Sequence, residues 1–242
     1  DSDRASASVS VGASVSDSVS VGASVSDSVS VGASASDSDR LGGSLLVIDE
    51  LCRAVGISVP RGWPAYFDMA KAWGARTDLT GADTDAELAE ILFLDAARLI
   101  EAAWLQSVGS LVDVGAGVGA PTIPLLLASP AQRATLVEPR RKRTAFLRSA
   151  IGSLDLANRV QVLEHSVDPD APIVEGAPFD AALSRATFSP ERWCAIGSRL
   201  AGEVWVFTAG TAPEESDLRL LRRIDYEVPS TGAPRSILAY AR

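Results

Sequence analysis

The chain has 242 residues, of which 47% are hydrophobic and 22% are charged, and its formal net charge is −9. This acidic balance excludes a protein that binds nucleic acid through its overall charge, so any such contact needs a local basic patch. No apolar run reaches transmembrane length, and Cys52 and Cys194 lack a metal-ligand spacing. We therefore expect a cytoplasmic protein with buried, reduced thiols, no metal site and no membrane partner.

The first 43 residues are a low-complexity segment. A ten-residue sequence at 9–18 recurs unchanged at 19–28, and recurs at 29–38 with Ala35 in place of valine. The repeat consists almost entirely of Ser, Val, Ala, Gly and Asp, so it cannot bury enough apolar surface to offset the conformational entropy of the chain. We expect residues 1–43 to be a disordered tail, although alternating valines could also form an amyloid-like or solenoid strand.

Residues 44–106 predict a small helical lobe. The expected helices cover 44–58, 64–73 and 84–104. Ser44 is a suitable N-cap for the first helix, and Pro64 suits the first turn of the second. Thr84-x-x-Glu87 is a capping-box pattern, so the third helix is expected to begin at Thr84.

Residues 107–242 alternate between strand and helix patterns. The expected strands cover 110–114, 134–138, 160–164, 179–184, 202–208, 224–229 and 235–241, and the expected helices cover 121–129, 140–153, 189–200 and 213–223. Long connections between strands imply right-handed crossovers and a parallel sheet. The short 230–234 segment indicates an antiparallel hairpin between the last two strands. This α/β pattern resembles the class I (Rossmann-like) methyltransferase sheet, with seven mostly parallel strands and an antiparallel last strand.

A glycine-rich turn follows the first predicted strand. Gly115, Gly117 and Gly119 alternate directly after an apolar run that ends at Val114. Glycine permits positive φ and close approach of a ligand, and turns at the carboxyl ends of strands in open α/β sheets hold adenine-containing cofactors. Glu138 ends the next predicted strand, where a carboxylate can bind both hydroxyls of a ribose. The pattern predicts a cofactor site at these four residues.

Two kinds of cofactor fit this turn. The pattern Gly-x-Gly-x-x-Ala at 115–120 also satisfies the dinucleotide fingerprint, which needs free backbone amides to hold a pyrophosphate. Pro121 and Pro124 remove two of those amides from the first helical turns. S-adenosylmethionine has no phosphate, and Asp113 could attract its positively charged methionine end, or could only stabilise the turn. The sequence therefore favours S-adenosylmethionine as the cofactor.

Several ordered segments over residues 60–242 are typical of one methyltransferase group. They are Trp73 with Asp78-Leu79-Thr80, Leu94-Asp95, the 112–125 segment with its Pro-x-Ile-Pro-Leu continuation, Leu136-Val137-Glu138-Pro139 with Lys142-Arg143 and Phe146-Leu147-Arg148, Phe179-Asp180, Ser184-Arg185-Ala186, and Pro234-Arg235. In this order the segments resemble the bacterial 16S rRNA guanine-N7 methyltransferases, the glucose-inhibited division B family. The chain resembles a divergent member.

The resemblance implies cofactor contacts in three loops, at Gly115, Ala120, Val167, Asp168 and Arg185. In this fold, residues that follow the third strand lie over the adenine of the cofactor. Val167 and Asp168 follow the third predicted strand, so their position agrees with this role. Asp168 is one carbon shorter than the family's glutamate. Arg185 could instead be structural, paired with Asp180 or with Asp113.

Four positions depart from the family pattern. Leu92 replaces a histidine, Ser166 an arginine, Ala209 a lysine and Asp78 an asparagine. The positions that would hold the cofactor are kept, whereas polar positions on the substrate side are changed. These departures favour a divergent substrate or a loss of activity as alternatives to the family reaction.

One dense basic run stands at the start of the predicted 140–153 helix. It comprises Arg140, Arg141, Lys142 and Arg143, and positive charge at a helix N-terminus opposes the macrodipole. Binding of RNA phosphates therefore explains the run better than a solvated face does, and Arg148 and Arg235 could extend it. The sole histidine, His165, is not expected to be a base or a ligand. The five tryptophans are expected in the core, with Trp63 and Trp73 the candidates for stacking on a base.

Together these features predict an S-adenosylmethionine-dependent methyltransferase that acts on guanine N7 of 16S rRNA, as free RNA or in a ribosomal particle. N7 carries a lone pair and no proton, so the reaction needs orientation rather than a catalytic base. We expect a monomer. The alternatives are a catalytically silent protein that binds RNA or a partner, and a methyltransferase for a small molecule.

Overall fold

The computed structural model describes residues 35–209 and 217–242, with side chains from residue 42 onward. The strands are β1 (Ser110–Val114), β2 (Arg133–Val137), β3 (Val160–Leu163), β4 (Phe179–Ser184), β5 (Ala201–Thr208), β6 (Arg219–Glu227) and β7 (Pro234–Ala241). They form one sheet in the order β3-β2-β1-β4-β5-β7-β6. The first five strands run parallel, and β7 lies antiparallel between β5 and β6. The predicted fold class is confirmed.

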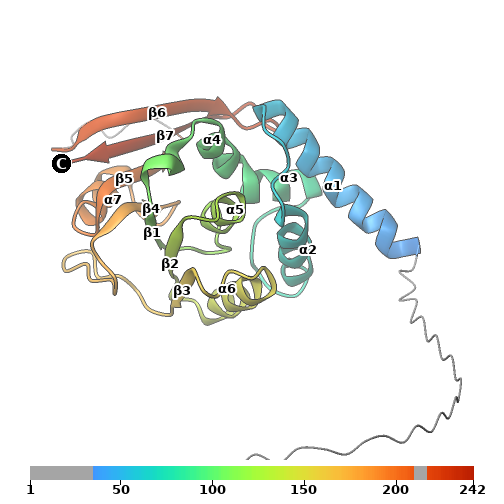
Figure 1. Cartoon of the computed structure of the whole chain (residues 1–242), viewed down its shortest axis with the longest axis horizontal. Coiled ribbons are helices and arrows are strands. Elements are labelled where there is room, and N and C mark those ends of the chain that lie inside the picture. The colour runs from blue at the N-terminus through green and yellow to red at the C-terminus, as the bar shows by residue number, and fades with distance from the viewer. Residues whose placement is uncertain (1–34, 210–216) are drawn as a thin grey trace, which may run out of the picture.

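Helices cover both faces of the sheet (Figure 1). They are α1 (Ala35–Val55), α2 (Trp63–Gly74), α3 (Asp85–Ala89), η1 (Glu90–Leu94), α4 (Asp95–Glu101), η2 (Trp104–Ser107), α5 (Thr122–Ala128), α6 (Arg141–Ser153) and α7 (Pro190–Gly197). Residues of β1 point alternately to the two faces, as the pleat requires. Leu111 packs in the cluster that contains residues of α1, α2, α4, α5 and α6, and Val112 packs in a second cluster with α7.

The first helix begins earlier than the sequence indicated. Helix α1 starts at Ala35, so residues 35–43, expected in the disordered tail, are helical. Ser44 lies inside this helix rather than at its N-cap, and its hydroxyl donates to Asp68 Oδ1 of α2 at 2.7 Å. Because α1 packs on α2, the Ser44 hydroxyl bonds to a neighbouring helix instead of capping its own. Residues 1–34 of the tail lie outside the described residues.

The helix expected over 213–223 is wrong where the structure describes it. Residues 219–227 form β6, which pairs with β7 through eight register positions and contains an irregularity between Leu220 and Arg222. Arginine and leucine have good helix propensity, but the neighbouring β7 offers a complete set of backbone partners, and this tertiary pairing overrides local preference. Residues 213–216 lie outside the described range.

The helix expected over 84–104 is interrupted. The predicted capping box is present: the Thr84 hydroxyl accepts from the Glu87 amide, and the Glu87 carboxylate accepts from the Thr84 amide. A π-helical turn, η1, follows at 90–94 and separates α3 from α4. Such turns are frequent at functional sites, and they change which backbone carbonyls are paired within the helix.

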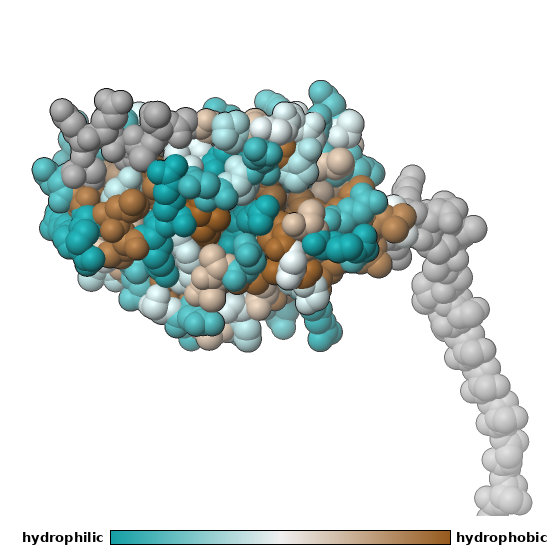
Figure 2. Space-filling view, turned by 90° about the horizontal axis from the view of Figure 1, so that it is seen from above, coloured by the Kyte–Doolittle hydropathy of each residue, from teal (hydrophilic) through white to brown (hydrophobic). Residues whose placement is uncertain are grey.

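The surface has mixed character. Hydrophobic areas are interrupted by hydrophilic ones on the face that Figure 2 shows. Leu45 and Leu46 on α1 are 47% and 63% exposed, and Leu220 on β6 is 46% exposed. Cys52 and Cys194 are buried free thiols, as expected. Within the described ranges, no helix is both long and apolar enough to cross a membrane.

Candidate cofactor and acceptor site

The turn between β1 and α5 needs its glycines for two different reasons. Gly115, Gly117 and Gly119 have φ of +77°, +59° and +87°, where side chains are disfavoured. A Cβ on Gly115 would stand 2.2 Å from Thr187 Oγ1, and one on Gly119 would stand 2.5 Å from Ile123 Cδ1. On Gly117 the nearest atom would be 3.8 Å away. Packing therefore excludes side chains at Gly115 and Gly119, whereas Gly117 presents open backbone.

Glu138 is buried at the end of β2 and holds this turn. Its Oε2 accepts a hydrogen bond from the Gly117 amide at 2.8 Å, and its Oε1 accepts one from the Arg140 amide at 2.9 Å. The side chain is only 2% exposed. Each carboxylate oxygen can accept more than one hydrogen bond, so these contacts leave capacity for the hydroxyls of a ribose. The expected ribose contact stays a prediction.

Asp113 is a second buried acid beside the turn. Its Oδ2 accepts from the Thr122 hydroxyl at 2.7 Å. Burial raises the pKa of this carboxyl to about 7, while the hydrogen bond from Thr122 and the charge of Arg185 act to lower it and Glu138 acts to raise it. A buried carboxyl of this kind favours a nearby cation, because a positive charge would stabilise its ionised form. The methionine end of S-adenosylmethionine carries such charge.

The start of α5 does not suit a phosphate. Pro121 is the N-cap of this helix, and Pro124 lies in its first turn. Neither residue has a backbone N–H to donate, so the cradle that would hold a pyrophosphate lacks two donors. Ala120, which precedes them, is buried.

The second predicted cofactor loop follows β3. Val167 is buried in the cluster that contains Val137 of β2, and Asp168 is exposed, with its Oδ1 accepting from the Asp170 amide at 2.9 Å. Glu138 donates its own backbone N–H to the Leu163 carbonyl at the end of β3. The loop thus starts beside the acid that holds the glycine turn.

Arg185 follows β4 and is held by the helical lobe. Its Nη1 donates to Asp95 Oδ2 at 2.9 Å and to the Ile91 carbonyl in the π-helical turn at 2.8 Å. The alternative that Arg185 is structural through a pairing with Asp180 or Asp113 is wrong in its partners, since the ion pair forms with Asp95. Asp180 instead accepts from the backbone of Gly109 and Ser110.

Sequence reasoning did not assign roles to Asp95 and Tyr226. The Tyr226 hydroxyl donates to Asp95 Oδ1, so one carboxylate joins α4, the end of β4 and the strand β6. Burial and the neighbouring Asp95 raise the pKa of Tyr226, which keeps the hydroxyl protonated as a donor. The sequence pointed to Asp95 only through Leu94-Asp95, one of the segments that resemble the family. It gave no sign of a role for Tyr226, which lies in none of those segments.

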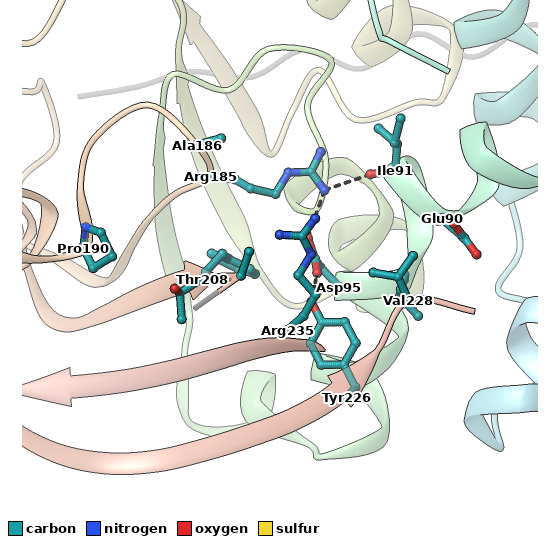
Figure 3. A pocket seen from close by; sticks show the side chains of 13 residues that line it. Glu90, Ile91, Asp95, Arg185, Ala186, Pro190, Thr208, Tyr226, Val228 and Arg235 are labelled. Atoms are coloured by element: carbon teal, nitrogen blue, oxygen red, sulfur yellow. Dashed lines mark hydrogen bonds and ion pairs between the residues drawn. The ribbon is translucent and has the colours of Figure 1, made fainter. Parts of the chain in front are cut away.

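A cavity of about 550 Å³ opens beside Arg185 (Figure 3). Its walls come from η1 and α4, from the ends of β4 and β5, and from the β6–β7 hairpin. Arg185 and Arg235 both project into the view with their guanidinium groups close to Asp95. The structure thus brings Arg235, expected in the RNA surface, to the cavity wall rather than to the other basic residues.

The basic run lies at the first turn of α6. Arg140, Arg141 and Lys142 are exposed, and Arg143 is half-buried, with Nη1 3.9 Å from where a Cβ on Gly117 would stand. Strand β2, which precedes the run, is four strand positions from β7, which carries Arg235. At a strand spacing of about 4.8 Å this separation is roughly 19 Å. The run and Arg235 therefore form two separate basic groups at the same edge of the sheet.

The departures from the family pattern lie in different environments. Leu92 is buried in the main core, where an apolar side chain is satisfied by packing, and Ser166 and Asp78 are exposed. Ala209 lines the cavity. Trp63 is fully buried and stacks on Phe93, so the expectation that it could stack on a base is wrong, whereas Trp73 is partly exposed.

The fold and these side chains define a class of protein. A seven-stranded sheet with an antiparallel final strand, a glycine turn, and two buried acids beside it are the features of a class I S-adenosylmethionine-dependent methyltransferase. Open backbone at Gly117 and the acids Asp113 and Glu138 fit that cofactor better than a phosphate-bearing one. Among the residues that the structure describes, no group of three or more His, Cys, Asp or Glu side chains could hold a metal ion.

Comparison with known proteins identifies the family. Residues 63–220 match the GidB family, described as rRNA small subunit methyltransferase G. The chain is 34% identical over 159 residues to ribosomal RNA small subunit methyltransferase G of Anaeromyxobacter dehalogenans, covering 65% of this chain and 68% of that protein. It is 31% identical over 209 residues to the Myxococcus xanthus protein of the same name, covering 79% and 94%. The chain belongs to the GidB family.

A solved structure supports the fold alone. The O-methyltransferase from Bacillus cereus, solved in complex with SAH, matches with a TM-score of 0.52 and 16% identity, covering 74% of this chain and 91% of that one. The sequence-based expectation of this family and of a methyltransferase fold is thus confirmed.

Proposed function

We infer that this protein is an S-adenosylmethionine-dependent methyltransferase that transfers a methyl group to guanine N7 of small-subunit rRNA. Membership of the GidB family supports the reaction and the substrate. The observation in the structure that carries the inference is the hydrogen bond from the Gly117 amide to Glu138, because it fixes an open glycine backbone beside a buried acid at the carboxyl ends of β1 and β2.

The residues at the site would bind and orient the two reactants. When bound, S-adenosylmethionine supplies an electrophilic methyl group on a sulfonium. Glu138 and Asp168 would bind polar groups of the nucleoside, and Asp113 would balance the cationic methionine end. Guanine N7 has a lone pair and no proton to lose, so these residues accelerate transfer by alignment and by exclusion of water, without a catalytic base.

The basic residues would contact the RNA backbone. Arg140, Arg141 and Lys142 are exposed at the start of α6, close to the glycine turn, and Arg235 lies at the cavity. Because the two groups are roughly 19 Å apart by strand spacing, they would contact different phosphates of one RNA. We also propose that the protein acts in the cytoplasm as a monomer, on rRNA or on a ribosomal particle.

The experiment is methyl transfer from radiolabelled S-adenosylmethionine to small-subunit rRNA transcribed without modifications, followed by mapping of the labelled nucleotide. We expect label in N7-methylguanine at one position. The rRNA of a strain that lacks the gene should have lost the same modification. Label on another atom, or an unchanged N7-methylguanine signal in that strain, would exclude the proposed reaction. Calorimetry with S-adenosylmethionine tests the cofactor separately.

A further inference from the structure

We propose that the cavity beside Arg185 is the pocket that receives the acceptor guanine, with Arg235 binding a phosphate of the same nucleotide. This inference rests on the proposed function and adds to it the place where the substrate base binds. The cavity has a volume of about 550 Å³. Pockets that hold small organic molecules span roughly 300–1,000 Å³, so one nucleotide fits.

The position of the cavity relative to the cofactor turn is the first argument. Arg185 and Ala186 lie in the cavity wall, and the next residue, Thr187, packs against Gly115 of the glycine turn, with its Oγ1 2.2 Å from where a Cβ on that glycine would stand. The Ser184 hydroxyl, one residue before Arg185, donates to the Val114 carbonyl at 2.7 Å, directly before that turn. The cavity and the turn are therefore neighbours that share one wall, as methyl transfer between two bound reactants requires.

The chemistry of the walls is the second argument. Ile91, Leu94 and Phe207 give the cavity apolar surface, and Arg185 and Arg235 add two guanidinium groups. Unstacked bases are bound in proteins between apolar or aromatic side chains and the planes of arginine side chains. Arg235 is exposed at the start of β7, so its charge is accessible to a phosphate outside the cavity.

The carboxylates at the cavity are the third argument. Asp95 is occupied by Arg185 and Tyr226, and Glu90 accepts from the backbone amide and hydroxyl of Ser230. Each of these two described carboxylates is thus engaged in holding the wall, and neither is presented as a free base. Such a wall suits an acceptor atom with a lone pair and no proton, which is the situation of guanine N7.

Arg185, in the shared wall, has N–H groups left with which to bind a ligand. Both hydrogen bonds that the Arg185 side chain makes with described residues use Nη1. A guanidinium has five N–H groups in a fixed plane, so the Nε and Nη2 side is available to the base or to the cofactor. Figure 3 shows this side chain extending from β4 across the cavity toward η1.

The test fills the cavity without touching the glycine turn. Ala209→Trp and Val228→Trp place bulk on two different walls, one at the end of β5 and one at the β6–β7 hairpin. Leu220→Trp is the matched control, because Leu220 is exposed on β6 and does not line the cavity. Each variant is measured for S-adenosylmethionine affinity by calorimetry, and for kcat/KM with unmodified small-subunit rRNA.

We expect both cavity variants to lower kcat/KM for RNA by about tenfold or more, with cofactor affinity within about twofold of wild type. Leu220→Trp should change neither. Unchanged RNA methylation in both cavity variants would overturn the inference and leave the proposed function standing. Loss of cofactor binding in both, with thermal stability kept, would also overturn it, since the cavity would then be part of the cofactor site. A wild-type chain that binds cofactor but methylates no RNA would instead refute the proposed function and with it this inference.

Discussion

The hydroxyl of Tyr226 donates a hydrogen bond to Asp95, although the two residues are 131 positions apart in the chain. The other oxygen of Asp95 accepts from Arg185 at 2.9 Å. A single carboxylate of the helical lobe therefore fixes both the arginine that follows β4 and the strand that forms one border of the sheet. The side chains of Asp95 and Arg185 are 12% and 27% exposed, so solvent screens this ion pair only in part.

Replacement of this carboxylate tests its role. Asp95→Asn should lower the free energy of unfolding by about 1–3 kcal/mol, because it leaves a half-buried guanidinium without its counter-charge. The matched control is Asp85→Asn, whose partner Lys71 is half-exposed, and which should cost under about 1 kcal/mol. Urea unfolding measures both. Equal small losses in the two variants would show that the Asp95 network does not hold the lobe to the sheet.

The glycine turn predicts two different outcomes for two similar substitutions. Gly119→Ala should destabilise the fold by at least about 2 kcal/mol, because the new Cβ would meet Ile123 and Leu147 and would have to adopt a positive φ. Gly117→Ala should cost about 1 kcal/mol of strain but weaken S-adenosylmethionine binding, since its surroundings are open in the absence of the cofactor. Thermal unfolding and calorimetry separate the effects. Wild-type affinity in Gly117→Ala would place the cofactor elsewhere.

Glu138 should be sensitive to loss of one acceptor. In Glu138→Gln one oxygen becomes an NH₂ group, which cannot accept, so only one of the amides of Gly117 and Arg140 keeps its acceptor. We expect S-adenosylmethionine to bind about 10-fold to 100-fold more weakly, with Glu164→Gln as an exposed control that breaks only an ion pair with Arg148. Calorimetry gives both dissociation constants. A variant that binds as tightly as wild type would contradict a role for this acid in the cofactor site.

Asp113 predicts a particular pH dependence of stability. Its carboxyl has a pKa of about 7 in the folded protein against 3.8 for the unperturbed group. Between these values the folded state binds more protons than the unfolded state, so the free energy of unfolding falls as the pH rises. Compared with Asp113→Asn, the wild type should lose a few kcal/mol between about pH 4 and about pH 7. Unfolding curves of the two proteins that stay parallel across this window would contradict the raised pKa.

The same group should couple to cofactor binding. If Asp113 balances the cationic methionine end, S-adenosylmethionine affinity should rise between about pH 6 and about pH 8, because the ionised carboxylate is the form that attracts the cation. Asp113→Asn should remove this dependence. Calorimetry in two buffers of different ionisation enthalpy would also detect the proton released on binding.

The basic run should affect RNA and not the cofactor. Arg141→Glu and Lys142→Glu reverse exposed charges at the start of α6, and Arg133→Glu makes the same change at the start of β2, the opposite end of that strand. We expect the first two to weaken RNA binding and to reduce its salt dependence by about one unit of slope for each phosphate that is no longer bound. Filter binding at several salt concentrations measures this slope. An equal effect of all three reversals would indicate general charge repulsion instead of a site.

Local patterns in the sequence determined the class of fold and the centre of the site. The glycines at 115–119, the acid Glu138 and the alternation of strands with helices are short-range features, because a strand, a tight turn and a helix start each depend on a few neighbouring residues. The capping box at Thr84 was predictable for the same reason. The order of the resembling segments added the family.

The tertiary structure decided what partners distant residues have. Strand β6 is extended because β7 pairs with it, Ser44 bonds to Asp68 because α1 packs on α2, and Arg185 meets Asp95 instead of Asp180 because the lobe covers the ends of β4 and β5. The cavity lies where η1 and α4, the ends of β4 and β5, and the β6–β7 hairpin meet. Pairs at the cavity join residues up to 140 positions apart, and no local propensity or spacing encodes which of them become neighbours.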